Sequence, residues 1–282
     1  MSCIVYKFDN LEKLINNEQD KHQEIISFYK EFNDEKVTNL EKLKDNTQFV
    51  FTNEINKSET KSTIIQLLNK LNKSNLQKIY TSIRDIKFSS NDELDDLIKQ
   101  FIIKIKQESN MVRPLVGRLC KDLSSTFFID KDGEKIHFIR LMLRATFTEY
   151  SSAMNFKSKD WDEEKAKKSI ILLGTLMNAG VVDGEITEKI VEDFKKKIAF
   201  IEPNKVNSET YYNEVEKSMQ LLSLLISMIV EKENKEIFIN AKPFIDKELT
   251  KYENIKCITR KTRIFFKEAL NKLENDNIVD KN

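Results

Sequence analysis

Residues able to do acid–base or nucleophilic chemistry are scarce in this sequence. The 282 residues include two histidines, His22 and His137, and three cysteines, Cys3, Cys120 and Cys257. A catalytic base must lie within hydrogen-bond reach of the group it serves, and no Ser, Cys or carboxylate set shows a recognisable spacing for that. We therefore expect no catalytic residues and a protein that is not an enzyme.

Metal and cofactor sites are not indicated either. Structural zinc sites use local pairs of Cys or His, and none of these five residues lies close to another in the sequence. Neither a Walker-type nor a dinucleotide-binding glycine motif is present. The odd number and wide spacing of the cysteines argue against a disulfide framework and for a reducing compartment. We expect no metal, no cofactor and no disulfide.

Short basic clusters are the groups most able to bind a ligand, because Lys and Arg can neutralise the phosphates of RNA. No aromatic side chain is interleaved with them for base stacking. RNA binding and an ordinary solvated helix face both remain as interpretations. The clusters are Lys165, Lys167 and Lys168; Lys195, Lys196 and Lys197; and Arg260, Lys261 and Arg263.

Helices must position these side chains, because the sequence has few of the residues that tight turns and sheets use. Only 5 Gly and 3 Pro occur in the whole chain, so the composition predicts an all-α fold. Ten amphipathic segments follow one another, with boundaries good to a few residues. They cover 60–71, 74–88, 92–107, 111–128, 134–156, 162–179, 186–200, 209–231, 235–254 and 258–274.

The segment at 92–107 shows the pattern most clearly. Its apolar residues recur at helical spacing and must be buried against other elements; they are Leu94, Leu97, Ile98, Phe101, Ile102 and Ile105. The preceding Asn91-Asp92-Glu93 supplies a cap and first-turn acidic groups. Pro114 and Pro243 are expected near helix starts, where a missing amide does least harm.

Ten such helices can bury their stripes by stacking as about five antiparallel pairs into a HEAT-type α-solenoid. The expected breaks contain turn residues: Asn72-Lys73-Ser74, Asp130-Lys131-Asp132-Gly133, Asp183-Gly184 and Glu202-Pro203-Asn204. No strict sequence repeat is present, so helix pairing alone leaves a compact irregular bundle open.

Four motifs resemble the middle domain of the translation initiation factor 4G family. Leu67-Leu68-Asn69-Lys70-Leu71, with Leu76 after it, is similar to the family's opening Leu-Asn-Lys-Leu. Leu119-Cys120-Lys121-Asp122-Leu123 is similar to its second-repeat Leu-Cys-x-x-Leu. The run from Leu172 to Val182 is similar to its Phe-Ile-Gly-Glu-Leu-Phe pattern, and Thr262-Arg263-Ile264-Phe265-Phe266 to its last Ser-Arg-Ile-Arg-Phe. Together they span about 60–274, in the family's order.

Four positions depart from the family pattern: Leu76 and Leu172 replace Phe, Thr175 replaces an acidic residue, and Phe265 replaces Arg. The resemblance implies five HEAT-type helix pairs that clamp the DEAD-box RNA helicase initiation factor 4A, with one helicase lobe near each end. The scaffold then activates the helicase by holding both lobes ready for closure, without chemistry of its own.

The resemblance also assigns individual residues to helicase binding. Apolar residues on repeat helices are more commonly core, and their loss would disturb a partner surface indirectly. Arg263 is more plausible as a surface contact. The positions implied are Leu68, Leu71, Leu76, Leu172, Leu221, Arg263 and Phe266.

The expected domains are an N-terminal extension at 1–58, the factor 4G-like domain at 59–275 and a disordered tail at 276–282. The extension contains apolar residues that could line one helix face, as a cap on the first repeat or in a partner's groove. The resemblance adds the cap-binding factor 4E as a partner, through a Tyr-x-x-x-x-Leu-apolar segment. Tyr6 and Leu11 have that spacing, but Glu12 occupies the apolar position.

Charge and hydropathy favour a soluble, cytoplasmic protein. Residues 1–60 hold 8 Lys and 12 Asp or Glu, a balance of −4; since the whole chain is at +1, residues 61–282 carry +5. No apolar run approaches the ~20 residues that span a bilayer.

Two alternatives to the activating scaffold stay open. One is a related adaptor of the same domain family in messenger RNA processing or decay, and the other is a decoy that sequesters the helicase.

Overall fold

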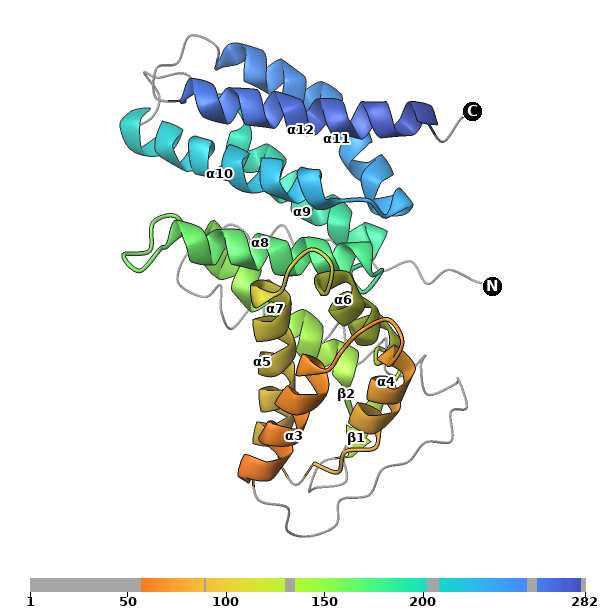
Figure 1. Cartoon of the computed structure of the whole chain (residues 1–282). Helices are drawn as coiled ribbons and strands as arrows, with labels where there is room; N and C mark the ends of the chain where they lie inside the picture. Colours follow the sequence, from red (N-terminus) through yellow and green to blue (C-terminus); the bar gives the residue numbers. More distant parts are fainter. Residues whose placement is uncertain (1–56, 89, 130–134, 202–207, 253–257, 280–282) are drawn as a thin grey trace. The chain divides into compact units, whose positions relative to one another are not determined.

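The computed structural model describes residues 57–88, 90–129, 135–201, 208–252 and 258–279 (Figure 1). The chain divides into units at 1–48 and 49–282, and every described element belongs to the second. The described residues are mostly helical, as the composition predicts, with ten helices and one short hairpin. Residues 1–56 of the predicted extension, including Tyr6, Leu11 and His22, lie outside them, and its last two residues begin α3.

The first four helices are α3 (Lys57–Asn69), α4 (Leu76–Arg84), α5 (Asn91–Gln107) and α6 (Arg113–Asp122). All six apolar residues of the predicted stripe in α5 are buried, at 8 % exposure or less. Asp92 and Glu93 lie in its first turn, although Ser90 rather than Asn91 is the residue before the helix. Pro114 lies at the start of α6, as predicted.

A hairpin replaces the predicted helical residues between α6 and the next helix. Strand β1 (Phe127–Ile129) pairs antiparallel with β2 (Lys135–His137), with Phe128 opposite Ile136. The prediction of helix at 111–128 and from 134 was therefore wrong at these ends. A physical reason is that Phe127, Phe128 and Ile129 have aromatic and β-branched side chains that suit a strand. Phe128 is buried there against Phe88, with ring centroids 4.8 Å apart.

The remaining helices are α7 (Phe138–Met154), α8 (Glu163–Asn178), α9 (Gly184–Ile198), α10 (Ser208–Met228), α11 (Lys232–Lys251) and α12 (Arg260–Val279). Pro243 lies inside α11, so its expected place near a helix start was wrong. The side chain of Pro243 is exposed there. Helix α12 continues to Val279, beyond residue 276 where the tail was expected to begin.

Helices contact one another within pairs and between pairs, and α5 also contacts α8. Each helix packs on its partner in the pairs α3 with α4, α5 with α6, α7 with α8, α9 with α10, and α11 with α12. Between pairs, α4 contacts α6, α6 contacts α8, α8 contacts α10, and α10 contacts α12. On the other side of the pairs, α3 contacts α5, α5 contacts α7, and α9 contacts α11. Figure 1 shows α8, α10 and α12 side by side, each starting at the same edge.

Two glycines mark close approaches between these helices. A Cβ atom on Gly117 of α6 would lie 3.1 Å from Cγ2 of Thr175 in α8. A Cβ atom on Gly174 would lie 3.3 Å from side chains of Leu225 and Met228 in α10. Contacts this short need a neighbour to move, so Gly lets the backbones pack closely at both crossings.

Candidate functional site

The residues that the resemblance assigns to helicase binding are mostly in the protein core. Five of the seven are buried: Leu68 at 2 % exposure, Leu71 at 6 %, Leu172 and Phe266 at 0 %, and Leu221 at 2 %. Leu76 and Arg263 are half-buried. The five buried side chains therefore present almost no surface to a partner, and packing is the role that their positions support.

The first family-like segment, Leu67 to Leu71, is followed by a turn that side-chain hydrogen bonds hold together. Asn72 and Asn75 form two reciprocal hydrogen bonds. The backbone amide of Asn72 donates to Asn75 Oδ1 at 2.8 Å, and the backbone amide of Asn75 donates to Asn72 Oδ1 at 3.1 Å. Asn75 Nδ2 also donates to the Lys70 carbonyl at 2.6 Å. The predicted turn at Asn72-Lys73-Ser74 is confirmed, and it sets the angle between α3 and α4.

The segment most similar to the family pattern forms the end of α8 and its turn. Thr175, at 5 % exposure, donates from Oγ1 to the Ile171 carbonyl at 2.7 Å. Gly180 has φ +66, and the Val181 amide reaches back to the Leu176 carbonyl at 2.9 Å. A left-handed residue with this bond is the Schellman ending that favours Gly. The segment is thus built to stop α8 and start α9.

Asn178 ties this turn to the turn between α10 and α11. Its Nδ2 donates to the Met228 carbonyl at 2.8 Å, and its Oδ1 accepts from the amides of Val230 at 2.9 Å and Glu231 at 3.3 Å. The side-chain amide of Asn234, which is buried, accepts from the Thr187 hydroxyl and donates to the Met177 carbonyl at 3.1 Å. These bonds fix successive turns in register, because buried polar groups must be satisfied.

The start of α12 is held by polar contacts to α10 and α11. Glu216 Oε1 accepts from the hydroxyl of Thr259 at 2.6 Å and of Thr262 at 2.8 Å. Arg263 donates from Nη1 to the Tyr252 carbonyl at 3.1 Å. Arg263 is therefore engaged within the protein rather than extended into solvent.

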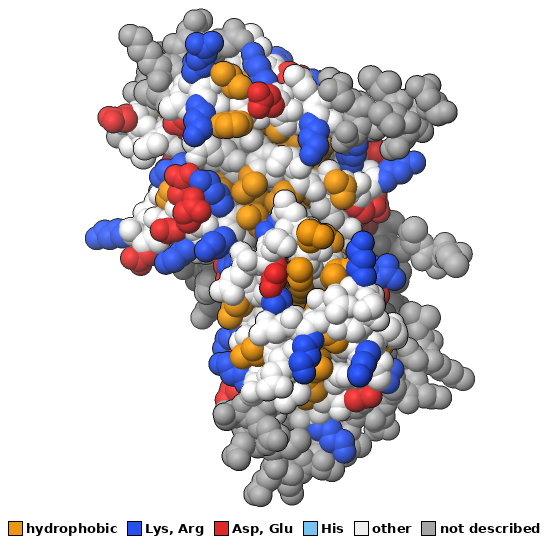
Figure 2. Space-filling model, in the orientation of Figure 1, with side chains coloured by type: hydrophobic (Ala, Val, Ile, Leu, Met, Phe, Trp, Pro, Cys, Tyr) orange, Lys and Arg blue, Asp and Glu red, His pale blue; other side chains and the backbone are white. Residues whose placement is uncertain are grey.

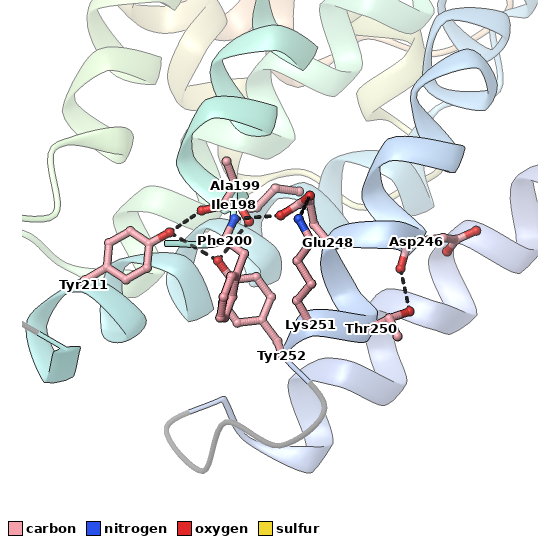
Figure 3. A network of polar contacts seen from close by, with 9 residues as sticks. All are labelled: Ile198, Ala199, Phe200, Tyr211, Asp246, Glu248, Thr250, Lys251 and Tyr252. Atoms are coloured by element: carbon pink, nitrogen blue, oxygen red, sulfur yellow. Dashed lines mark hydrogen bonds and ion pairs between the residues drawn. The ribbon is translucent and has the colours of Figure 1, made fainter. Parts of the chain in front are cut away.

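A tyrosine network joins the ends of α9 and α11 to the start of α10 (Figure 3). The buried Tyr252 donates from its hydroxyl to the Ile198 carbonyl at 3.0 Å and lies 3.2 Å from the Tyr211 hydroxyl. Burial is the main cause that raises the pKa of both tyrosines. Glu248 Oε2 accepts from the Phe200 amide at 2.7 Å, and its Oε1 lies 2.6 Å from Lys251 Nζ.

The basic clusters are partly neutralised by neighbouring carboxylates. Lys167 lies 2.7 Å from Glu163 and 3.0 Å from Glu164, and these bonds raise its pKa. Lys195 pairs with Glu192 at 2.5 Å, and Lys197 with Asp193 at 3.8 Å. The side chains that stay exposed are Lys165, Lys168, Lys196, Arg260 and Lys261.

Aromatic side chains lie beside lysines in space, although none is interleaved with the clusters in sequence. Trp161, just before α8, donates from Nε1 to the Ala153 carbonyl at 2.9 Å. Lys217 of α10 lies with Nζ 4.2 Å from the centre of the Trp161 ring and 5.9 Å from that of Phe156. Attraction of a cation to a ring face stabilises such contacts. The α7–α8 connection is thereby held on α10, a long-range contact that no local sequence pattern signals.

Titratable groups with altered pKa values are spread through the protein. Burial raises the pKa of the Cys120 thiol, so that thiol stays protonated and is a poor nucleophile. Partial burial lowers the pKa of Lys189 to about 8, against the opposing attraction of Glu185 and Glu188. Among the described residues, no three His, Cys, Asp or Glu side chains are grouped to hold a metal ion.

No protein-family model matches the sequence, and no curated protein does either. Within the part of the chain that the structure describes, no helix has the length and apolar character to cross a membrane.

Proposed function

We propose that the protein is a non-catalytic scaffold of translation initiation, built as a HEAT-type α-solenoid of five helix pairs, that binds and activates the DEAD-box helicase initiation factor 4A. One observation supports the solenoid most strongly. Side-chain hydrogen bonds between equivalent helices of the second to fifth pairs span 43 to 47 residues, and the bond between α3 and α5 spans 35. HEAT-type repeats have periods of about 40–47 residues.

These four bonds link the second, third, fourth and fifth pairs, which is three successive steps of the array. Lys106 of α5 bonds Glu149 of α7 across 43 residues, and Tyr150 of α7 bonds Asp193 of α9 across 43. Thr187 of α9 bonds Asn234 of α11 across 47. Glu216 of α10 bonds Thr262 of α12 across 46. Bonds at this spacing support a stack of equivalent helices of the kind that neighbours in a repeat array form.

The four family-like motifs all lie on the paired helices or at their ends. Three lie on second helices of their pairs, α6, α8 and α12, and the fourth ends α3. Their order along the chain, which is the family's order, supports the factor 4G-like interpretation. A scaffold that binds both lobes of the helicase would lower the entropic cost of closing them, which speeds ATP turnover without a catalytic group of its own.

Exposed basic residues support a subsidiary proposal of RNA contact. Lys165 and Lys168 are exposed on α8, next to the Trp161 ring that Lys217 covers. Phosphate contacts by such lysines would add affinity that falls with salt. Contact with the cap-binding factor 4E through Tyr6 and Leu11 is also part of the proposal and falls on residues outside those described.

The experiment is a pull-down from a eukaryotic lysate with the full chain, followed by an assay with purified factor 4A. We expect factor 4A as the principal protein recovered and a rise in its RNA-dependent ATPase rate. Recovery of the helicase with an unchanged or lowered rate would favour the decoy. Recovery of a different DEAD-box helicase would favour an adaptor in messenger RNA processing or decay. Recovery of no helicase would reject the proposal.

A further inference from the structure

The side of α12 that faces solvent carries a stripe of its own. Helix α12 packs on α10 and α11 with one side. On the other side, four exposed residues recur at the spacing that puts side chains on one face of a helix. We call them the α12 outer stripe, and they are Lys261, Ile264, Phe265 and Glu268.

Two large apolar residues are neighbours at the centre of this stripe. Ile264 is 44 % exposed and Phe265 is 50 % exposed. Single exposed apolar residues are ordinary on protein surfaces, but an adjacent pair between charged groups matches the apolar centre and polar rim of an interface. A polar outer face normally stops a helical array from stacking further, and this pair interrupts it.

The order of the charges makes the stripe complementary to itself. Lys261 precedes Ile264 by three residues, and Glu268 follows Phe265 by three residues. If two copies pack antiparallel about a twofold axis between Ile264 and Phe265, the four apolar side chains meet at the axis. Each Lys261 then lies opposite Glu268 of the second copy, once on either side of the axis. A twofold interface requires this self-complementarity, because both copies use the same surface.

The other cations of α12 lie away from this contact. Arg260 and Lys267 are about a quarter of a turn round the helix from the centre of the stripe. Lys272 donates to the Ser227 carbonyl at 3.2 Å, which directs it toward α10. Figure 2 shows hydrophobic side chains over α12 together with basic and acidic ones. The whole chain has a formal charge of +1, so two copies repel each other little at long range.

We propose that the α12 outer stripe joins two copies of this chain in an antiparallel twofold dimer, with Ile264 and Phe265 at its centre and two ion pairs between Lys261 and Glu268 at its rim. The dimer goes beyond the proposed function and does not depend on the helicase. Specific interfaces typically bury about 1,200–2,000 Å² in total, and one helix face from each copy lies at the low end of that range. We therefore expect a weak dimer with a dissociation constant in the micromolar range.

The test is sedimentation velocity of the full chain over a series of concentrations. The single variants Lys261→Glu and Glu268→Lys each put like charges opposite one another, twice in every dimer. The double variant Lys261→Glu with Glu268→Lys exchanges the two charges and keeps them complementary. The matched control is Lys99→Glu, which reverses a cation 65 % exposed on α5.

A second set of variants tests the apolar centre. Ile264→Ser with Phe265→Ser removes both apolar side chains from the stripe. Its matched control is Met111→Ser, which alters an apolar residue 84 % exposed in the α5–α6 connection. Thermal unfolding of every variant checks folding, and Phe265→Gln alone replaces the apolar double variant if the unfolding midpoint of that variant falls.

We expect each single charge variant to weaken dimerisation about tenfold, because two attractions become two repulsions. The double charge variant should dimerise within about threefold of the unaltered chain. An equal mixture of the two single variants should also dimerise, since each altered position then meets the opposite charge on the other copy. The apolar variant should weaken dimerisation about tenfold or more, as loss of interface anchors does. Both controls should behave as the unaltered chain does.

Three results would overturn the dimer. The first is an unaltered chain that sediments as a monomer even at about 0.5 mM. The second is a dimer that forms equally well with the apolar variant or with both single charge variants. The third is weakened single variants that neither the charge exchange nor the mixture rescues, because the charges would then not face each other across a twofold axis. Each of these results leaves the proposed function standing, and failure to bind factor 4A would leave the dimer standing.

Discussion

Two adjacent phenylalanines in α12, one buried and one exposed, allow a role in packing to be tested separately from a role in binding. Phe266 is fully buried between α12 and its neighbours, whereas Phe265 is 50 % exposed. Truncating a buried Phe to Ala removes its transfer free energy and leaves a cavity, at a cost of about 3–5 kcal/mol. Truncating the exposed ring should cost less than about 1 kcal/mol. We therefore expect Phe266→Ala to lose a large part of a free energy of unfolding that is typically about 5–15 kcal/mol.

Urea denaturation followed by circular dichroism measures this difference as the free energy of unfolding extrapolated to water. The m-values of Phe265→Ala, Phe266→Ala and Phe266→Leu should agree, so that midpoints report stability. Phe266→Leu should recover much of the loss, because it refills most of the cavity. A Phe266→Ala variant that costs less than about 1 kcal/mol yet no longer binds factor 4A would refute the reasoning, since Phe266 would then be a contact rather than core.

The remaining predictions concern polar groups in the last three helix pairs. Asn178→Ala should destabilise the protein by about 1–3 kcal/mol, because it leaves turn amides and a carbonyl without their bonds, and Asn178→Asp should cost less in the same urea assay since the acceptor remains. Tyr252→Phe removes the hydroxyl bonded to Ile198 and should cost about 1–2 kcal/mol; an unchanged midpoint would show that water replaces that bond. The folded pKa of Lys189, about 8, lies below its usual 10.5, so the unfolded chain binds more protons between those values and stability should rise with pH there. Lys189→Met should abolish that rise and raise the thermal midpoint at pH 7. If the stability of the Lys189→Met variant changes with pH as that of the unaltered chain does, burial of the Lys189 ammonium is not the cause of the rise.

The periodicity of apolar residues predicted most of the helical structure, because it identifies the side chains that each helix buries. The stripe from Leu94 to Ile105 is buried as expected, since six apolar residues on one helical face have no other stable placement. The hairpin was missed because Phe127-Phe128-Ile129 is a short apolar run, which suits a strand and a helix end equally well by spacing alone. Pro243 was misplaced because proline is commonest near helix starts, whereas here it occupies the exposed side of α11.

The candidate site was harder to predict than the fold. Phe265 and Phe266 are identical in type and adjacent, and only the packing of α12 on α10 and α11 decides which one reaches solvent. The contact of Lys217 with Trp161 joins residues 56 positions apart and exists only once α8 and α10 are stacked. The sequence identifies the basic residues of α12, but not that Ile264 and Phe265 are the apolar residues of this helix that reach solvent.

The central claim is that this chain activates a two-lobed helicase by binding it. The most direct measurement is the steady-state ATPase rate of purified factor 4A with saturating RNA, titrated with the full chain. We expect the ATPase rate to rise to a plateau, with a half-maximal chain concentration that matches the dissociation constant from calorimetry. A rate that stays flat or falls while calorimetry reports tight binding would contradict activation, and a rate that stays flat without any binding would contradict the whole account.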